Sequence, residues 1–245
     1  MPDALQAFRS ATALDLLTLA QLHDRELDVP TVAALKQEQF PASLGLRLQS
    51  TTGLEALDML ASVVAELEFD SRQQDEHAAD FAAIYLTHGM SASPCESVWV
   101  DEEGLAMQSA MFSVRDCYAR FGWQAHDWRK RTVDHLVRQL PFIAELLGGD
   151  DEDVLVDVAG FLDEHTLRWL PDFAERVAQR CATPFYAGLC MLTASYLDEL
   201  RDILATILDK PRPSAEEIAQ LSMTEVEETP LPMPGPYVPG RSPSW

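Results

Sequence analysis

Apolar residues recur at intervals of three and four positions along most of this chain, and this spacing limits what the chain can fold into. The repeat places apolar side chains on one face of an α-helix, whereas a half-buried strand needs an apolar residue at every second position. The helical repeat fills residues 3 to 208, and strand patterns are nearly absent. We therefore predict an all-α fold that forms a single-domain helical bundle.

In several segments the apolar repeat is clear enough to predict where a helix lies. We expect helices ending near His23, spanning Gly53 to Leu67, ending near His88, spanning 105–121 with Gly122 as its C-cap, spanning 133–147, and running from Thr183-Pro184 to about Leu208. The acidic run 150–153 precedes one further helix, where negative charge complements the helix dipole. We favour that explanation over a metal site.

The composition changes near the C-terminus. Residues 211–245 hold eight of the fifteen prolines and few large apolar side chains. Such a segment buries too little apolar surface to offset the entropy of ordering it. We predict a helical domain over residues 1–210 and a disordered tail over residues 211–245.

The charge of the chain restricts its partners. There are 40 acidic and 18 basic residues, which gives a formal net charge of −22. This field repels the phosphates of nucleic acids and anionic lipids, and it attracts basic partners. We expect no nucleic-acid binding, although the acidity is also explained by solubility alone.

The cysteines and the N-terminus indicate the compartment. Cysteines 95, 117, 181 and 190 form no Cys-x-x-Cys pair and no zinc-ligand spacing, so we expect reduced thiols, no metal and no cofactor. The N-terminus lacks the basic and continuous apolar regions of a secretory signal. No apolar run is long enough to span a membrane. These features predict a cytoplasmic protein.

Sequence motifs of the common enzymes are absent. We find no His-Glu-x-x-His, no Gly-x-Ser-x-Gly, no P-loop and no dinucleotide-binding glycine pattern. The lone histidines His23, His77 and His126 are interpreted as solvated surface residues. A nucleophilic pair of Cys95 and His135 is not excluded, because such pairs form in space rather than in sequence. Our prediction is that the chain is not an enzyme.

One segment between two predicted helices departs from the helical pattern. It reads Ser93-Pro94-Cys95-Glu96-Ser97-Val98-Trp99. Proline removes a backbone donor and restricts the residue before it, so a helix does not continue through this segment. We expect a short exposed loop that presents the Glu96 carboxylate.

The loop and its neighbours resemble the TorD/DmsD family of redox-enzyme maturation chaperones. That family has a helix ending in an aromatic-Leu pair, a Pro-x-Glu-Ser-Val-aromatic loop and an Asp-His-Leu helix start. The corresponding residues here are Tyr85-Leu86, the segment from Pro94 to Trp99, and Asp134-His135-Leu136. A fourth element, Phe161 to His165 followed by Trp169 and Phe173, is similar to the family's late helix. The likeness covers residues 75 to 200, but Cys95 stands where relatives carry an aromatic residue.

The resemblance implies a function and partners. Proteins of this family hold an apo-molybdoenzyme, bind its twin-arginine signal peptide, and permit export after the molybdenum cofactor is inserted. The expected partner is therefore the precursor of a molybdenum-cofactor oxidoreductase together with that peptide. The family also allows both monomers and domain-swapped dimers.

The resemblance also implies the position of the peptide site. The residues expected there are Tyr85, Leu86, Pro94, Cys95, Glu96, Ser97, Trp99, Asp134 and His135. Carboxylates receive guanidinium groups in a bidentate way, so Asp134 and Glu96 are the expected arginine receivers. The alternative for Asp134 is that it caps a helix, with the His135 imidazole completing the cap.

Aromatic and apolar residues near the loop are expected to lie either in the peptide site or in the hydrophobic core. The polar groups of Tyr85 and Trp99 suit the edge of a groove, whereas Phe81 and Ile84 are expected in the core. His165, Trp169 and Phe173 share one face of a single helix by their spacing, and packing is the favoured interpretation for them. The competing functions are an acidic helical adaptor for another basic amphipathic helix, and a Cys/His enzyme.

Overall fold

The computed structural model describes residues 2–87, 89–100, 104–124, 131–149, 153–214 and 216–218. The chain divides into two compact units, Met1–Arg212 and Pro213–Trp245. Only a few residues of the second unit are described, so the predicted disorder of the tail lies almost wholly outside the described residues. The fold below is that of the first unit.

The first unit is all-α, as predicted, and its described residues contain no strand beyond one isolated bridge. Its helices are α1 (Pro2–Asp24), α2 (Val29–Gln37), α3 (Thr51–Glu66), α4 (Ser71–Phe81), α5 (Ser97–Val100), α6 (Ser109–Arg120), α7 (Leu136–Gly148), α8 (Val154–Glu164), α9 (Leu170–Arg180) and α10 (Pro184–Leu208). A π-helical turn (Ala82–Leu86) extends α4, and a 3₁₀ turn (Thr166–Arg168) joins α8 to α9.

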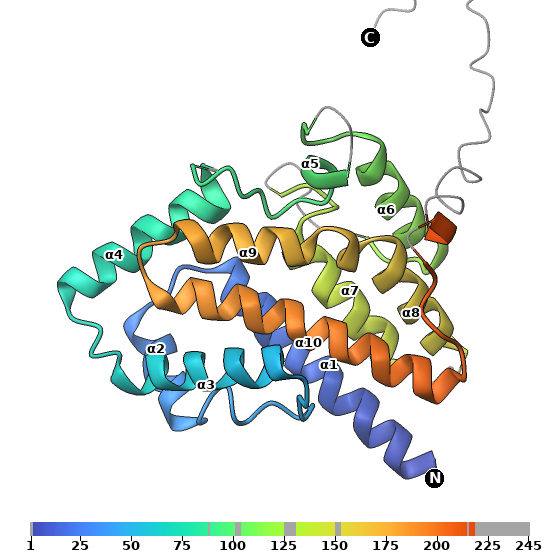
Figure 1. The fold of residues 1–245 in the computed structure, drawn as a ribbon, viewed down its shortest axis with the longest axis horizontal. Helices are drawn as coiled ribbons and strands as arrows, with labels where there is room; N and C mark the ends of the chain where they lie inside the picture. The colour runs from blue at the N-terminus through green and yellow to red at the C-terminus, as the bar shows by residue number, and fades with distance from the viewer. Residues whose placement is uncertain are drawn as a thin grey trace, which may run out of the picture. The chain divides into compact units, whose positions relative to one another are not determined.

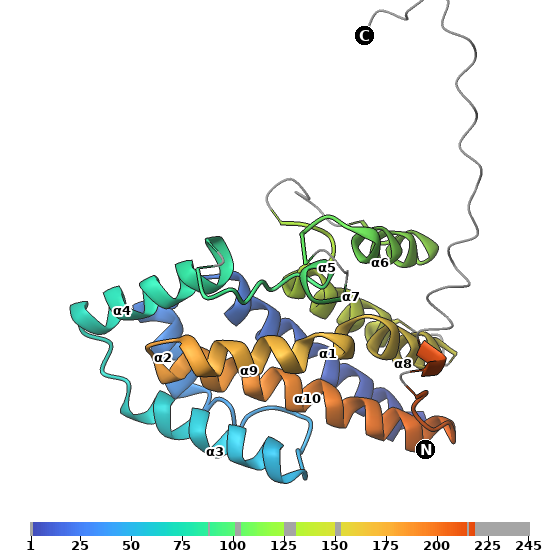
Figure 2. The same ribbon diagram turned by 45° about the horizontal axis from the view of Figure 1, so that its top comes forward.

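Helix α10 is the centre of the bundle. It lies between α9 and α3, and both views show this arrangement (Figures 1 and 2). Residues on most of its circumference are buried, including Phe185, Leu189, Tyr196 and Leu200. A helix that is apolar on most sides must be covered on most sides, which explains why α10 has these neighbours.

A second pair, α1 and α7, packs against this centre. The two helices share an extensive contact, and α7 also contacts α8. Arg9 of α1 is buried, and its Nε donates to the carbonyl of Leu147 at 3.0 Å, near the C-terminal end of α7. This contact satisfies one of the carbonyls that a helix end leaves without a partner.

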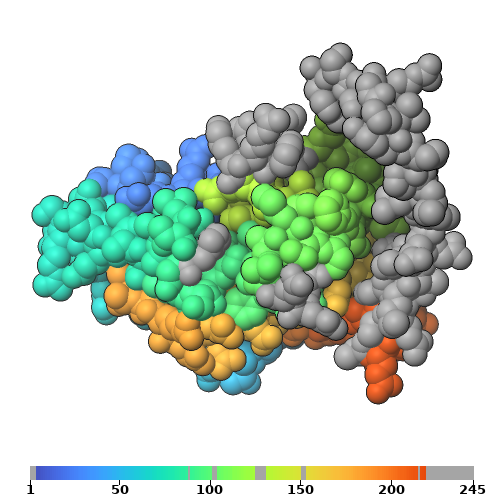
Figure 3. All heavy atoms as spheres, turned by 90° about the horizontal axis from the view of Figure 1, so that it is seen from above, coloured from blue at the N-terminus to red at the C-terminus, as the bar shows by residue number. Residues whose placement is uncertain are grey.

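The short helices α5 and α6 lie outside the main layers, beside α7 (Figures 1 and 2). On the face shown in Figure 3, the green surface of α6 and its flanking residues is prominent. Tyr118 of α6 anchors this helix, because its ring contacts Phe142 of α7 at a centroid distance of 4.5 Å. Phe121 is the C-cap residue, and Gly122 follows it with a positive φ of 65°, so the prediction that a glycine ends this helix is confirmed.

Some predicted helix boundaries were wrong. Helix α2 was not predicted, although Asp28 accepts from the backbone N–H of Thr31 at 2.8 Å and Pro30 occupies its first turn. Three residues of the presumed loop, Ser97 to Trp99, belong to α5, and α6 begins at Ser109 rather than near residue 105. His88, the expected end of the third helix, lies outside the described residues.

The late helix is interrupted. His165, Trp169 and Phe173 do not share one helix, because α8 ends at Glu164 and α9 begins at Leu170. Pro171 at the start of α9 explains the break, since proline favours the first turn of a helix and disfavours its interior. All three side chains are buried, so the packing interpretation is confirmed.

Candidate functional site

The two motif segments, 93–97 and 134–136, form one paired unit. Cys95 and His135 make an isolated antiparallel bridge. The backbone N–H of Leu136 donates to the carbonyl of Pro94 at 2.9 Å, and that of Glu96 donates to the carbonyl of Asp134 at 3.2 Å. Segments distant in the sequence are thereby held side by side, which fixes the start of α5 against the start of α7.

Asp134 strengthens this pairing through its side chain. The carboxylate is fully buried, and Oδ2 accepts from the backbone N–H of Ser97 at 2.9 Å and from its hydroxyl at 2.6 Å. The N-cap of α7 is instead His135, whose Nδ1 accepts from the N–H of Val137 at 3.1 Å. The alternative that Asp134 caps this helix is therefore wrong, and its carboxylate holds the other motif segment.

The prediction that Glu96 stands on an exposed loop is also wrong. Glu96 is fully buried, and Pro94, Cys95 and Ser97 are buried beside it. Gln139 Nε2 donates to its Oε2 at 2.6 Å, and His165 Nδ1 lies 2.9 Å from its Oε1. Burial raises the pKa of Glu96 above its ordinary value, while the nearby His165 acts in the opposite direction. Both expected arginine receivers are thus engaged inside the protein.

Tyr85 lies in the core and not at a groove edge. Its hydroxyl lies 2.6 Å from Nδ1 of His23, and both side chains are buried. Phe81 and Ile84 are buried as predicted. Leu86, the next residue of the motif, is 61% exposed and is available to a partner.

Trp99 is half-buried at the edge of the paired unit. Its indole N–H donates to the carbonyl of Ser93 at 2.7 Å, which closes the loop over the start of α5. The guanidinium of Arg176 lies 4.9 Å from the centre of the ring. A cation at this distance is attracted to the face of an indole. Of the nine residues expected at the peptide site, only Leu86 and Trp99 are not buried.

The histidines expected on the surface are in the core. His23 and His77 are both buried, so the solvated interpretation is wrong for them, and His126 lies outside the described residues. Thr193 donates its hydroxyl to Leu189, so its oxygen accepts from His23 Nε2–H, and Nδ1 accepts from Tyr85. Burial lowers the pKa of His23 to about 3, which keeps the imidazole neutral.

The geometry does not support a Cys/His nucleophile. Cys95 is buried beside Thr132, with Sγ 3.4 Å from Oγ1, and burial raises the pKa of its thiol to about 11. The thiolate is the reactive form of cysteine, so this thiol is inert near neutral pH. His135 Nδ1 is already used to cap α7. In the described part of the chain, no group of three or more His, Cys, Asp or Glu side chains is arranged to hold a metal ion.

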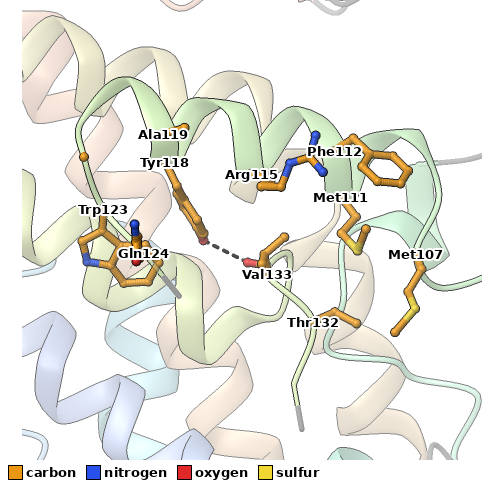
Figure 4. Close-up of a pocket in the computed structure, with 11 residues that line it drawn as sticks. Met107, Met111, Phe112, Arg115, Tyr118, Ala119, Trp123, Gln124, Thr132 and Val133 are labelled. Atoms are coloured by element: carbon orange, nitrogen blue, oxygen red, sulfur yellow. Dashed lines mark hydrogen bonds between the residues drawn. The ribbon is translucent and has the colours of Figure 1, made fainter. Parts of the chain in front are cut away.

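A pocket of about 590 Å³ that was not predicted from the sequence lies beside α6 (Figure 4). Its lining residues are Met107, Met111, Phe112, Arg115, Tyr118, Ala119, Gly122, Trp123, Gln124, Thr132 and Val133. Met107 and Met111 fit the apolar repeat of the helix predicted over residues 105–121. Helix α6 instead turns Ala110, Val114 and Tyr118 inward, which leaves its other apolar face outside. In the sequence, the apolar residues of this segment cover more than one face of the helix, and this wide pattern indicated that some of them would stay exposed.

Among the described residues, no helix combines the length and the apolar character needed to cross a membrane.

The family model described as "Nitrate reductase delta subunit" matches residues 49–175. A Vibrio parahaemolyticus protein named Chaperone protein TorD is 26% identical over 185 residues, covering 72% of this chain and 84% of the relative. Chaperone protein TorD of Actinobacillus pleuropneumoniae is 27% identical over 177 residues, covering 71% and 86%. That of Vibrio vulnificus is 26% identical over 220 residues, covering 80% and 99%.

Proposed function

Because the chain belongs to the TorD/DmsD family of redox-enzyme maturation chaperones, we propose that it binds the precursor of one molybdenum-cofactor oxidoreductase through its twin-arginine signal peptide. The protein is a chaperone and not an enzyme. Its role is to hold the client while the molybdenum cofactor is inserted. This work precedes export, so the proposed location is the cytoplasm.

The observation that carries the proposal is the match over residues 49–175, which contains both motif segments and the buried residues behind them. The pairing of 93–97 with 134–136 supports it, because a recognition surface must be held in one conformation to bind without a large entropy cost. An adaptor for an unrelated basic helix would not account for this match.

The buried carboxylates of Glu96 and Asp134 are not free to bind arginine, so we assign them a different role. Glu96 and Asp134 are engaged by Gln139, His165 and Ser97, so we propose that they position the paired unit. Pro94, Cys95, Ser97 and His135 shape the same unit from inside, whereas Tyr85 packs in the core against His23. The contacts with the peptide are then made by Leu86 and Trp99, which retain exposed surface.

The charge of the chain supports a basic ligand. A net charge of −22 attracts the two arginines of the signal peptide over a distance of about 8 Å at physiological ionic strength. Binding should therefore weaken as salt is added, and it should weaken more for a peptide with two arginines than for one with two glutamines.

Titration calorimetry tests the proposal. The full chain is titrated with the client's signal peptide and with a matched peptide in which both arginines are replaced by glutamine. We expect the first peptide to bind more tightly than the second, and we expect Trp99→Ala and Leu86→Ser to weaken its binding. Leu14→Ser is the matched control, because Leu14 is 66% exposed on α1. Equal affinity for both peptides would contradict a twin-arginine site.

Cofactor insertion needs its own measurement. The client is produced with and without this protein, and its molybdenum content is measured by elemental mass spectrometry. We expect a lower molybdenum content without the chaperone. An unchanged molybdenum content would contradict a role in cofactor insertion, but it would not contradict peptide binding.

A further inference from the structure

Trp99 lies against a cation of its own chain. The guanidinium of Arg176 is 4.9 Å from the centre of the indole ring. The indole N–H donates to the carbonyl of Ser93 at 2.7 Å, and the ring of Phe173 meets the indole edge to face at a centroid distance of 6.4 Å. Because these two contacts fix the orientation of the indole, Arg176 covers the ring but is not needed to hold it.

Few other contacts hold the Arg176 side chain. Its Nη1 donates to the carbonyl of Ser91 at 3.2 Å in a bond that is exposed to solvent. In the part of the chain that the structure describes, no carboxylate forms an ion pair with Arg176, whereas the buried Arg201 pairs with Asp163 at 2.7 Å. Water replaces an exposed hydrogen bond at little net cost. A ligand can therefore displace Arg176 from the ring without breaking a buried ion pair.

A ring face that binds one guanidinium is able to bind another. The planar guanidinium stacks on aromatic faces, and the attraction is strongest for an indole. The net charge of −22 raises the concentration of basic ligands near the surface. A ligand arginine that reaches Trp99 therefore meets a surface that Arg176 already occupies.

We propose that Arg176 is an internal competitor for a guanidinium site on the face of Trp99. This inference rests on the proposed function and adds a regulation of that site. The contact is autoinhibitory, because the apparent affinity for an arginine ligand is reduced by the fraction of molecules in which Arg176 covers the ring. An ammonium lacks the planar shape that stacks on the ring, so the competition favours ligands with arginine over those with lysine.

The first test removes the competitor. We expect Arg176→Gln to bind a twin-arginine peptide about two- to fivefold more tightly in titration calorimetry, which is the factor that an exposed cation–π contact accounts for. Arg176→Lys should lie between this variant and the wild type. Circular dichroism melting checks that each variant is folded.

Arg180→Gln is the matched control. Arg180 lies one turn further along α9 and donates to the carbonyl of Met90, so this variant removes the same charge and a similar hydrogen bond. Among the described residues, the guanidinium of Arg180 covers no aromatic ring. We expect a smaller gain in affinity than for Arg176→Gln, since only the change in net charge acts.

Fluorine NMR reports on the ring itself. The protein is labelled with 5-fluorotryptophan, and the signal that disappears in Trp99→Phe is assigned to Trp99. The probes are the amides of acetyl-arginine and acetyl-citrulline, which are similar in shape but differ in charge. We expect the arginine probe to shift the Trp99 signal at a lower concentration in Arg176→Gln than in the wild type. The citrulline probe should leave the signal in place in both proteins.

The outcomes separate this inference from the proposed function. Unchanged or weaker peptide binding by Arg176→Gln, or an equal gain in Arg180→Gln, overturns the competition and leaves the proposed function standing. A Trp99 signal that responds to the arginine probe as expected, in a protein that does not prefer the twin-arginine peptide to its glutamine counterpart, supports the guanidinium site and overturns the proposed function. A Trp99 signal that does not respond to the arginine probe in either protein overturns the inference.

Discussion

A single carboxylate oxygen of Asp134 accepts two hydrogen bonds from Ser97, one from the backbone N–H at 2.9 Å and one from the hydroxyl at 2.6 Å. The other oxygen, Oδ1, is buried and has no hydrogen-bond partner among the described residues. Hydrogen bonds to an ionised acceptor are stronger than those between neutral groups, so Asp134 is the main side-chain link between the two motif segments.

Asp134→Asn should therefore destabilise the protein. The amide nitrogen would be buried without an acceptor, and the remaining hydrogen bonds would lose their charge assistance. We expect the free energy of unfolding to fall by about 1 to 3 kcal/mol in denaturant titrations. Asp28→Asn is the matched control, because Asp28 caps α2 at the surface and asparagine caps a helix equally well. An equally small change in both variants would show that the Ser97 link is weak.

Glu96→Gln should change the pH dependence of stability. Burial raises the pKa of Glu96, so the folded state keeps its proton at higher pH than the unfolded state, whose ordinary value is 4.5. The contribution of Glu96 to stability is present below that value and is lost as the pH rises through the folded pKa. Glutamine does not titrate, so the variant should gain relative to the wild type as the pH rises above about 4.5. Parallel stability curves would contradict the raised pKa.

His23→Gln should remove a pH dependence of the opposite sign. Burial lowers the pKa of His23 from 6.5 to about 3, so the unfolded state takes up the proton first. The contribution to stability is present above pH 6.5 and is lost as the pH falls from 6.5 toward 3, with a slope of at most about 1.4 kcal/mol per pH unit. Unfolding titrations across that range should give a flatter curve for the variant. The same slope in both proteins would mean that His23 is protonated in the folded state.

The long helices could be predicted because their apolar repeat is sustained. Helices α1, α3 and α10 extend over many turns, so the repeat identifies them in spite of local exceptions. Helix α2 is only nine residues long and was missed, although Asp28 and Pro30 are helix-start signals. The break after His165 could also be predicted from Pro171, which lies in the first turn of α9.

The burial of the motif residues could not be predicted from their local sequence. Glu96 is buried because Gln139 and His165, which lie 43 and 69 residues away, hydrogen-bond to its carboxylate. His23 is buried because Tyr85 and Thr193 form hydrogen bonds with both of its ring nitrogens. Without these distant partners, a charged or polar residue is expected at the surface.

Removal of residues 213–245 should change the thermal stability of the helical domain very little. The compact first unit ends at Arg212, which pairs with Asp198 at 2.6 Å and with Asp202 at 2.8 Å on α10. The removed segment is rich in proline and poor in large apolar residues, so its ordering would not be offset by burial.

The melting temperature of the chain ending at Arg212 should stay within about 3 °C of that of the full chain, since about 1 kcal/mol corresponds to a shift of this size in a domain of this length. The matched control is Arg212→Ala in the shortened chain, which removes partly exposed ion pairs and should cost less than about 1 kcal/mol. Differential scanning calorimetry of the three proteins decides the matter. A fall of many degrees on truncation alone would mean that the tail stabilises the helical domain.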